Sequence, residues 1–284
     1  MRASRPELPA RNSVRLDQLV IHSNFELPKQ QRLLEEVDAL RWDIVAKLGL
    51  TASDEPIHVY LFENAEQYKA FIHSRFPDFP DRRAFFVESD TRLSVYAQWG
   101  DHVAVDLRHE VTHGYLHSMV QNLPLWLDEG LAEYFEVPRG THGYHRINLD
   151  DLAAQYQAGR WRPDIRRLEA LKSVSDMSRT EYAEAWAWVH LLLETEPGRR
   201  DLLRGYLAGL RHDAAAEPLS NRLRQANLDS PQLLLDHIRS VATAGSQENH
   251  EPQSARPTTS ESRPLAPNGT GKTDETIPPL DLSL

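Results

Sequence analysis

The stretch that decides the fold runs from Val105 to Glu136 and reads VDLRHEVTHGYLHSMVQNLPLWLDEGLAEYFE. Its first half contains the H-E-x-x-H pattern as His109-Glu-Val-Thr-His113. Residues four apart lie on one face of a helix, so both imidazoles could reach a single ion. Glu110 would then lie beside the metal without ligating it, placed to take a proton from a metal-bound water. We therefore expect a metal-dependent hydrolytic site on this helix.

The second half of the same stretch predicts another helix that carries a row of carboxylates. Glu129, Glu133 and Glu136 follow one another at i, i+4 and i+7 and so share one side. A short Gln-Asn-Leu turn would fold this helix back, which brings the row towards His109 and His113. Two histidines and one carboxylate with an open fourth position form a catalytic zinc site. The spacing alone leaves both Glu129 and Glu133 open as the third ligand, and charge rows are also common on solvated faces.

The motif and the segment that follows it, Trp126-Leu-Asp-Glu-Gly-Leu-Ala132, resemble the gluzincin metallopeptidases, which include thermolysin-like enzymes and zinc aminopeptidases. The pattern is similar in particular to peptidase-MA-like bacterial zincins of unknown function. This resemblance implies a zincin-like, thermolysin-type catalytic domain that binds Zn²⁺. It implies that His109, His113 and Glu129 are the metal ligands and that Glu110 is the general base. It also implies that Glu133 accepts the spare N–H of a ligand histidine.

The same resemblance implies an oxyanion donor from outside the two motif helices. Tyr182 is the expected donor, because the segment from Glu181 to Trp188 resembles the late helix of that family. Tyr144, His142 and His145 are the alternatives. His117 follows the face of His113 and is expected at the rim of the site. Leu93–Ala97 is the candidate edge strand for pairing with an extended substrate.

We expect zinc-dependent peptide-bond hydrolysis by an endopeptidase, with a peptide or protein as substrate. The metzincin extension is excluded, because Leu116 and Met119 stand where Gly and His would be needed. No Gly-x-Met-x-Asn segment is present, which argues against an aminopeptidase. The alternative is a catalytically silent zincin-fold protein that binds zinc or a protein partner. The complete set of Glu110 and three ligands argues against that alternative.

The order of the elements predicts an α+β fold, because strands come first and helices dominate later. Residues 14–244 are expected to fold as one domain, with an α/β part over 14–138 and a helical part over 139–244. Residues 1–13 are expected to be flexible, and 245–284, rich in Pro, Ser and Thr, to form a disordered tail. The predicted helices are 28–48, 66–74, 106–120 with Asp106 as N-cap, 125–136, 150–158, 181–195, 199–210, 217–226 and 231–242; the predicted strands are 57–62, 84–87 and 93–97.

The composition excludes several classes of protein. The chain has 284 residues, and 42 acidic against 32 basic side chains give a net charge of −10, which argues against a nucleic-acid or anionic-membrane surface. No apolar run is long enough to span a bilayer. There is no cysteine, so only histidines and carboxylates remain as metal ligands. The basic first residues lead into no apolar stretch, and we therefore expect a cytoplasmic protein. The oligomeric state leaves no mark in the sequence.

Overall fold

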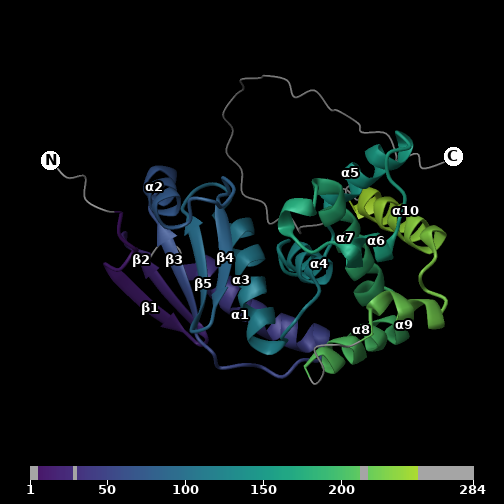
Figure 1. Cartoon of the computed structure of the whole chain (residues 1–284), viewed down its shortest axis with the longest axis horizontal. Helices are drawn as coiled ribbons and strands as arrows, with labels where there is room; N and C mark the ends of the chain where they lie inside the picture. Colours follow the sequence, from purple (N-terminus) through teal and green to yellow (C-terminus); the bar gives the residue numbers. More distant parts are fainter. Residues whose placement is uncertain (1–5, 28–30, 212–216, 249–284) are drawn as a thin grey trace, which may run out of the picture.

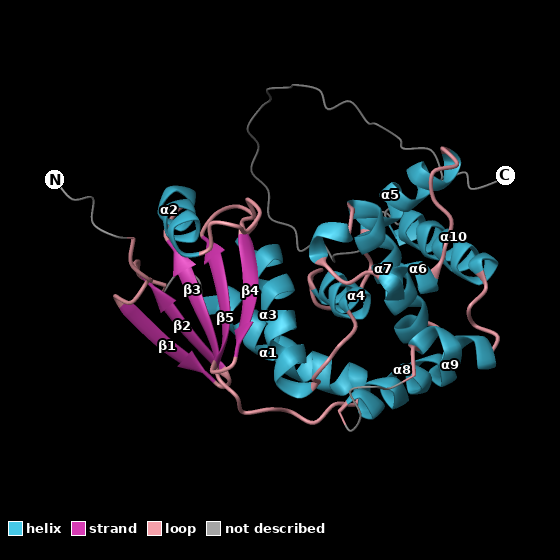
Figure 2. Ribbon diagram, viewed as in Figure 1, coloured by secondary structure: helices cyan, strands magenta, loops and turns pink. Residues whose placement is uncertain are grey.

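The computed structural model describes residues 6–27, 31–211 and 217–248. They form a mixed α+β fold with a small N-terminal sheet and a helical C-terminal half, which lie side by side in Figure 1. The predicted fold class is confirmed at this level. Figure 2 shows that every strand of the described part belongs to the one sheet.

The sheet contains five strands in the order β1-β2-β3-β5-β4. They are β1 (Asn12–Leu16), β2 (Leu19–Ser23), β3 (Ile57–Phe62), β4 (Ala84–Ser89) and β5 (Arg92–Gln98). The two outer pairs are antiparallel, whereas β3 is parallel to both β2 and β5. Helix α1 (Gln31–Leu48) connects β2 to β3, and α2 (Ala65–Arg75) follows β3. The sheet is thus mixed, with a β-α-β crossover that the simple strands-then-helices pattern did not predict.

One prediction about the sheet is wrong, and the difference matters for the site. The segment 84–97 does form an antiparallel hairpin, as expected. However, Leu93–Ala97 lies in β5, which pairs with β3 on one side and with β4 on the other. Its backbone hydrogen-bonding groups are therefore already used. Among the described strands, the edge on this side of the sheet belongs to β4.

The pleat of β3 divides its side chains between two apolar clusters. Ile57, Val59 and Leu61 belong to the main core, which also includes residues of α1 and of the segment 103–120. Tyr60 and Phe62 point to the opposite face, where they pack with aromatic residues of α2. Helix α3 (Val103–Met119) packs against β4, β5 and α1, so the helix that carries the motif is largely buried.

The start of α3 differs from the expectation. The N-cap is His102 rather than Asp106, so the helix begins at Val103. Asp106 instead accepts two hydrogen bonds from the guanidinium of Arg83, at 2.9 and 2.8 Å. The loop before β4 is therefore tied to the helix one turn before the motif. The turn after α3 contains Asn122 with a φ of +56°, a left-handed conformation that asparagine tolerates better than most residues.

The helical half is organised around α7 (Arg179–Glu194), which packs against α4, α5, α8 and α10. Its start is fixed by a capping box between Ser178 and Glu181. The other helices are α4 (Leu125–Phe135), α5 (Arg146–Gln157), α6 (Ile165–Ala170), α8 (Pro197–Leu210), α9 (Leu219–Gln225) and α10 (Pro231–Glu248). Helix α6 and the 3₁₀ turn Val174–Asp176 were not predicted, because elements this short carry little periodic signal.

Helix α4 ends before the boundary that was expected at residue 138, but it packs mainly with the helical half. It was assigned to the α/β part, yet its most extensive packing is against α7 of the helical half (Figure 1). The contact uses Gly130, where a Cβ would lie 2.7 Å from the carbonyl oxygen of Ala185. The two motif helices thus belong to different layers, and a site between them joins the halves.

The ends of the described chain also differ from the expected limits. Strand β1 begins at Asn12, within the stretch 1–13 that was expected to be flexible. Helix α10 reaches Glu248, past the expected start of the tail at 245. The predictions for residues 1–5 and 249–284, and for the first three residues of the predicted helix 28–48, fall outside the described residues. No helix in the described part is long and apolar enough to cross a bilayer.

Candidate metal centre

Three side chains from α3 and α4 converge between the two layers. The Nε2 atoms of His109 and His113 lie 3.2 Å apart. Oε2 of Glu129 lies 3.5 Å from the first and 3.6 Å from the second. These three residues form a group that could hold a metal ion, as the sequence predicted.

These three atoms form a triangle that fits a tetrahedral metal ion of the size of zinc. Bonds of about 2.0–2.1 Å to nitrogen and oxygen place neighbouring tetrahedral ligands roughly 3.3–3.4 Å apart, close to the three distances. Oε2 of Glu129 is moreover buried and has no hydrogen-bond partner among the described residues. An ionised oxygen in that position is costly unless a cation or a donor compensates it. A metal ion bound here would provide the missing partner.

The electrostatics of the three residues favour a cation. Burial alone would raise the pKa of Glu129, but His113 and His109 hold it down at about 2. Burial would lower the pKa of His113, whereas Asp128 and Glu129 raise it to about 10. The surroundings of both histidines thus stabilise positive charge. A metal ion would displace those protons and use the same negative potential.

Glu110 is available for proton transfer. Its side chain is buried, with 8% of the residue exposed, and it takes part in no hydrogen bond or ion pair with the rest of the described chain. Burial raises its pKa, against the lowering effect of His109 and His113. Glu110 lies between the two histidines in the sequence, and a carboxylate without a protein partner is free to accept a proton from water.

The other ring nitrogens of the two histidines are held by carboxylates of α4. Nδ1 of His109 forms a hydrogen bond of 2.7 Å with Oε2 of Glu136, whereas Nδ1 of His113 lies 2.9 Å from Oδ1 of Asp128 as an ion pair without hydrogen-bond geometry. The hydrogen bond to Glu136 fixes the orientation of the His109 ring and directs its Nε2 lone pair to the ion. Sequence reasoning placed Glu136 only in the row of carboxylates and gave Asp128 no role. The acidic character of α4 was the signal, but spacing could not assign the partners.

Glu133 does not have the hydrogen bond that the resemblance implied. Its Oε2 accepts a hydrogen bond from Nδ2 of Asn148, at 2.9 Å, and lies 3.4 Å from Nε2 of His145. The carboxylate that accepts from a ligand histidine is Glu136, because it lies almost two turns beyond Glu129 and faces His109. Glu133, Glu136 and His109 still form a group of potential ligand atoms, so Glu133 lies close to the centre.

His117 extends the network away from the triangle. Its Nε2 lies 3.0 Å from Oδ2 of Asp128, and its Nδ1 lies 2.6 Å from Oε2 of Glu88. Asp128 thus connects two histidines of α3, and Glu88 brings in strand β4. The ring of Phe86, also on β4, lies 6.1 Å from the ring of His113. The free edge of the sheet therefore runs beside the motif helix.

Tyr182 lies at the first turn of α7 and is joined to a residue that the sequence did not indicate. Its hydroxyl accepts a hydrogen bond from Nη2 of Arg82, at 3.2 Å, across 100 positions of the chain. Burial and the charge of Glu129 raise the pKa of Tyr182, so the phenol keeps its proton at neutral pH. Arg82 belongs to the loop before β4, whose position Arg83 fixes. No local pattern distinguishes such a loop arginine.

The three alternative candidates for the oxyanion donor, which follow α4, lie elsewhere. His142 has 78% of its side chain exposed and lies 3.5 Å from Glu194. The hydroxyl of Tyr144 packs against Gly245 of α10. His145 is buried, and its Nε2 lies 2.8 Å from Oε1 of Glu136, which places it behind His109. None of the three belongs to a group of potential metal ligands in the described residues.

The comparison with known proteins gives a family match, which covers the metal site but not the sheet. Residues 103–208 match a family profile described as a protein of unknown function (DUF1570). The match begins at the first residue of α3 and ends within α8, so it contains His109, His113 and Glu129 together with α7. No match was found among curated proteins. The chain is thus similar to DUF1570 proteins over the two motif helices and most of the helical half.

Proposed function

We propose that this protein is a zinc metallopeptidase of the gluzincin type, with a thermolysin-type arrangement, that hydrolyses peptide bonds. One observation carries the proposal: the buried, unpartnered Oε2 of Glu129 faces the Nε2 atoms of His109 and His113. Glu110 lies on α3 with the two histidines, and its carboxylate has no partner in the described chain. It supplies the general base that hydrolysis needs. The combination distinguishes a catalytic site from a purely structural metal site, which has no open position.

Each residue has a defined task in this proposal. His109, His113 and Glu129 would hold Zn²⁺, which supplies Lewis-acid polarisation of the scissile carbonyl and a more acidic water. Glu110 takes a proton from the attacking water and returns it to the leaving amine. Tyr182 donates its hydroxyl proton to the developing oxyanion. Because Arg82 donates to the phenol oxygen, it leaves that proton free and strengthens the hydroxyl as a donor.

The substrate in this proposal is an extended peptide or protein segment. The free edge of β4 runs beside α3 and offers backbone groups for pairing with such a segment. Phe86 and Glu88 of this strand both contact histidines of α3. A peptide paired with β4 would pass close to the metal ligands. β4 thus takes the role that was expected for Leu93–Ala97.

The first experiment measures metal content. Elemental analysis of the wild type, purified without added metal, should give about one zinc per chain. Glu129→Ala should lose it, because one of three ligands is removed. Glu133→Ala is the matched control, one turn further along α4, and should keep most of the zinc. Zinc retained in Glu129→Ala but lost in Glu133→Ala would reassign the third ligand, and no zinc in the wild type after reconstitution would refute the site.

The second experiment tests hydrolysis with fluorescently labelled casein as substrate. Glu110→Gln should retain zinc and lose turnover, because the amide cannot accept the proton from water. Full activity in Glu110→Gln would refute its assignment as the base. Zinc binding without hydrolysis by the wild type, over a broad set of peptides, would favour the silent zinc-binding alternative.

A further inference from the structure

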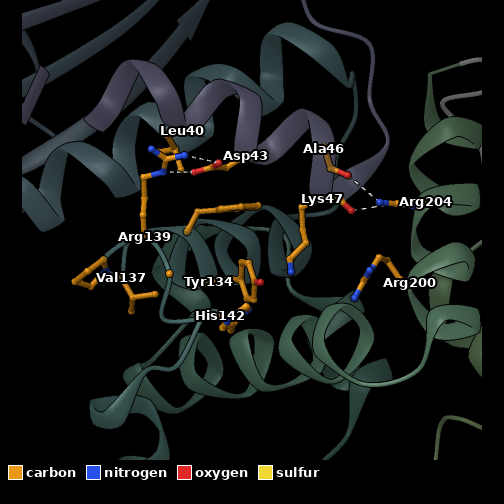
Figure 3. A pocket seen from close by; sticks show the side chains of 14 residues that line it. Leu40, Asp43, Ala46, Lys47, Tyr134, Val137, Arg139, His142, Arg200 and Arg204 are labelled. Carbon is orange, nitrogen blue, oxygen red and sulfur yellow. Dashed lines mark hydrogen bonds and ion pairs between the residues drawn. The ribbon is translucent and has the colours of Figure 1, made fainter. Parts of the chain in front are cut away.

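A cavity of about 630 Å³ lies on the side of α4 away from the metal centre. It is bounded by the C-terminal half of α1, by α8, and by the loop that follows α4 (Figure 3). None of the residues that line it belongs to a group of potential metal ligands. Its volume falls within the range of small-molecule sites. The proposed hydrolysis leaves this cavity without a role.

The cavity is basic, although the chain as a whole is acidic. Among the described residues that line it, four are cations, namely Lys47, Arg139, Arg200 and Arg204, and Asp43 is a carboxylate. The net charge of the whole chain is −10. A concave, partly desolvated surface concentrates such a local excess of positive charge. This reversal of charge indicates an anionic ligand.

Three of the four cations, Lys47, Arg139 and Arg204, form ion pairs with carboxylates. Arg139 donates to both oxygens of Asp43, at 2.5 and 2.8 Å. Nζ of Lys47 lies 2.5 Å from Oε1 of Glu194, which also accepts from Tyr134. An ammonium paired on one side still has two further donors. In Figure 3 the amino group of Lys47 lies beside the ring of Tyr134, and Nζ is 5.9 Å from the ring centroid.

Nη1 of Arg204 lies 3.8 Å from Oδ1 of Asp201, and main-chain carbonyls also hold the guanidinium groups of Arg200 and Arg204. Arg200 donates through Nε and Nη2 to the carbonyl of Leu193, at 3.0 and 2.7 Å. Arg204 donates to the carbonyls of Lys47 and Ala46 at the end of α1. Cationic side chains commonly donate to the last carbonyls of a helix. These contacts use the donors along one edge of each guanidinium. They leave Nη1 of Arg200 without a partner in the described chain, and Figure 3 shows this guanidinium directed towards the cavity.

The loop that closes the cavity has an unusual backbone. Gly140, His142 and Gly143 all have positive φ, of 86°, 52° and 73°. Gly143 is required, because a Cβ there would lie 2.1 Å from the ring of Tyr134. Gly140 has open space around it, so a ligand can approach its backbone closely. Left-handed non-glycine residues such as His142 are uncommon and often occur at ligand-binding loops.

We propose that this cavity binds a phosphate monoester, with the phosphate held between Lys47 and Arg200 and the rest of the molecule against Phe135 and Val137. Arg200 is already oriented by the carbonyl of Leu193, so little side-chain freedom is lost on binding. A free phosphate ion would fill only a small part of the volume, which favours a monoester of nucleotide size. The proposal is independent of the metal centre.

The test compares adenosine 5′-monophosphate with adenosine on the full-length protein by isothermal titration calorimetry. The phosphate-bearing molecule should bind saturably at submillimolar concentration, and adenosine should bind at least tenfold more weakly. Arg200→Gln should weaken binding about tenfold to a hundredfold, the effect of losing one charge-assisted contact. Arg211→Gln, in an exposed residue that bonds Thr51 outside the cavity, is the matched control and should bind like the wild type.

Two further measurements keep the result unambiguous. Titrations with and without EDTA should agree, because binding of the phosphate to zinc would disappear with the chelator. Val137→Trp should block the cavity without removing a charge, and it should also abolish binding. No saturable binding, equal binding of adenosine, or equal affinity in Arg200→Gln, Val137→Trp and Arg211→Gln would overturn the proposal. The last result would indicate nonspecific ionic association only.

Discussion

Nδ1 of His109 lies 2.7 Å from Oε2 of Glu136, and Oε1 of the same carboxylate lies 2.8 Å from Nε2 of His145. Nδ1 of His145 accepts the main-chain N–H of Asn148 at the start of α5, so its proton is on Nε2. Glu136 therefore accepts from both rings. This arrangement places the proton of His109 on Nδ1 and leaves its Nε2 lone pair for a metal ion.

We expect Glu136→Gln to weaken zinc binding about tenfold to a hundredfold, the usual effect of losing such a partner. Burial would raise the pKa of Glu136, but His109 and His145 lower it to about 2, so a charged acceptor is lost. Competition with a chromophoric chelator measures the zinc affinity. Glu133→Gln is the matched control and should change the affinity less than threefold, because the donor to Glu133 is Asn148. A larger loss in Glu133→Gln would restore the role that the resemblance implied.

Tyr182→Phe should lower kcat about a hundredfold to a thousandfold, the typical effect of removing one oxyanion donor, and should leave zinc content unchanged. Arg82→Gln should lower kcat by a smaller factor, because the hydroxyl remains. Steady-state kinetics on one peptide substrate separate the effects on kcat and KM. A Tyr182→Phe variant with unchanged kcat would remove Tyr182 from the mechanism. Tyr144→Phe is the control, since that hydroxyl lies against α10.

Periodicity and motif spacing predicted the parts of the fold that local sequence controls. The strand Ile57–Phe62 was predicted with its correct ends, and α1, α2, α4 and α7 to within a few residues of the part described. Strands β1 and β2 were both missed, because segments of five residues carry little periodic signal. The parallel pairing of β3 with β5 joins distant segments, and no local pattern encodes it.

The two histidines of the metal group followed from the motif and Glu129 from the family resemblance, whereas the residues around them needed the structure. Along a helix Glu136 lies only about 20° around the axis from Glu129, while Glu133 lies about 40° away. His117 contacts Asp128 and His109 contacts Glu136, so α3 and α4 run in opposite directions. This pairs the early His109 with the late Glu136. Arg82 was not foreseeable, because only the folded chain brings it to Tyr182.

Gly130→Ala should destabilise the protein by about 1–3 kcal/mol, as expected for overpacking. The new Cβ would lie 2.7 Å from the carbonyl oxygen of Ala185 and 3.0 Å from Cγ2 of Val189. Gly205→Ala, within α8, is the matched control, because nothing lies within 4 Å of its Cβ position. It should stabilise by about 0.5–1 kcal/mol through helix propensity. Urea unfolding of the metal-free proteins measures both values, and equal effects would contradict the close packing of α4 on α7.

The stability of the helical half should decrease on acidification because of His190 and His237. Nδ1 of His190 lies 3.0 Å from Nε2 of His237. Burial lowers the pKa of His190 to about 4, with Lys47 adding to the effect against Glu194. Burial, with His190 and Arg199, lowers the pKa of His237 to about 3. Below the ordinary value of 6.5 the unfolded chain binds more protons than the folded one, so the free energy of unfolding decreases from pH 6.5 towards pH 4.

His237→Phe removes one of these buried groups and isolates its contribution. Between pH 7 and pH 5 the variant should lose about 2 kcal/mol less unfolding free energy than the wild type does. Urea unfolding with EDTA throughout keeps the contribution of the metal ligands the same in both proteins. His73→Phe, at an exposed position of α2, should follow the wild-type pH dependence. If His237→Phe and the wild type lose stability in parallel over this range, His237 is protonated in the folded protein, and its burial against His190 does not keep it neutral.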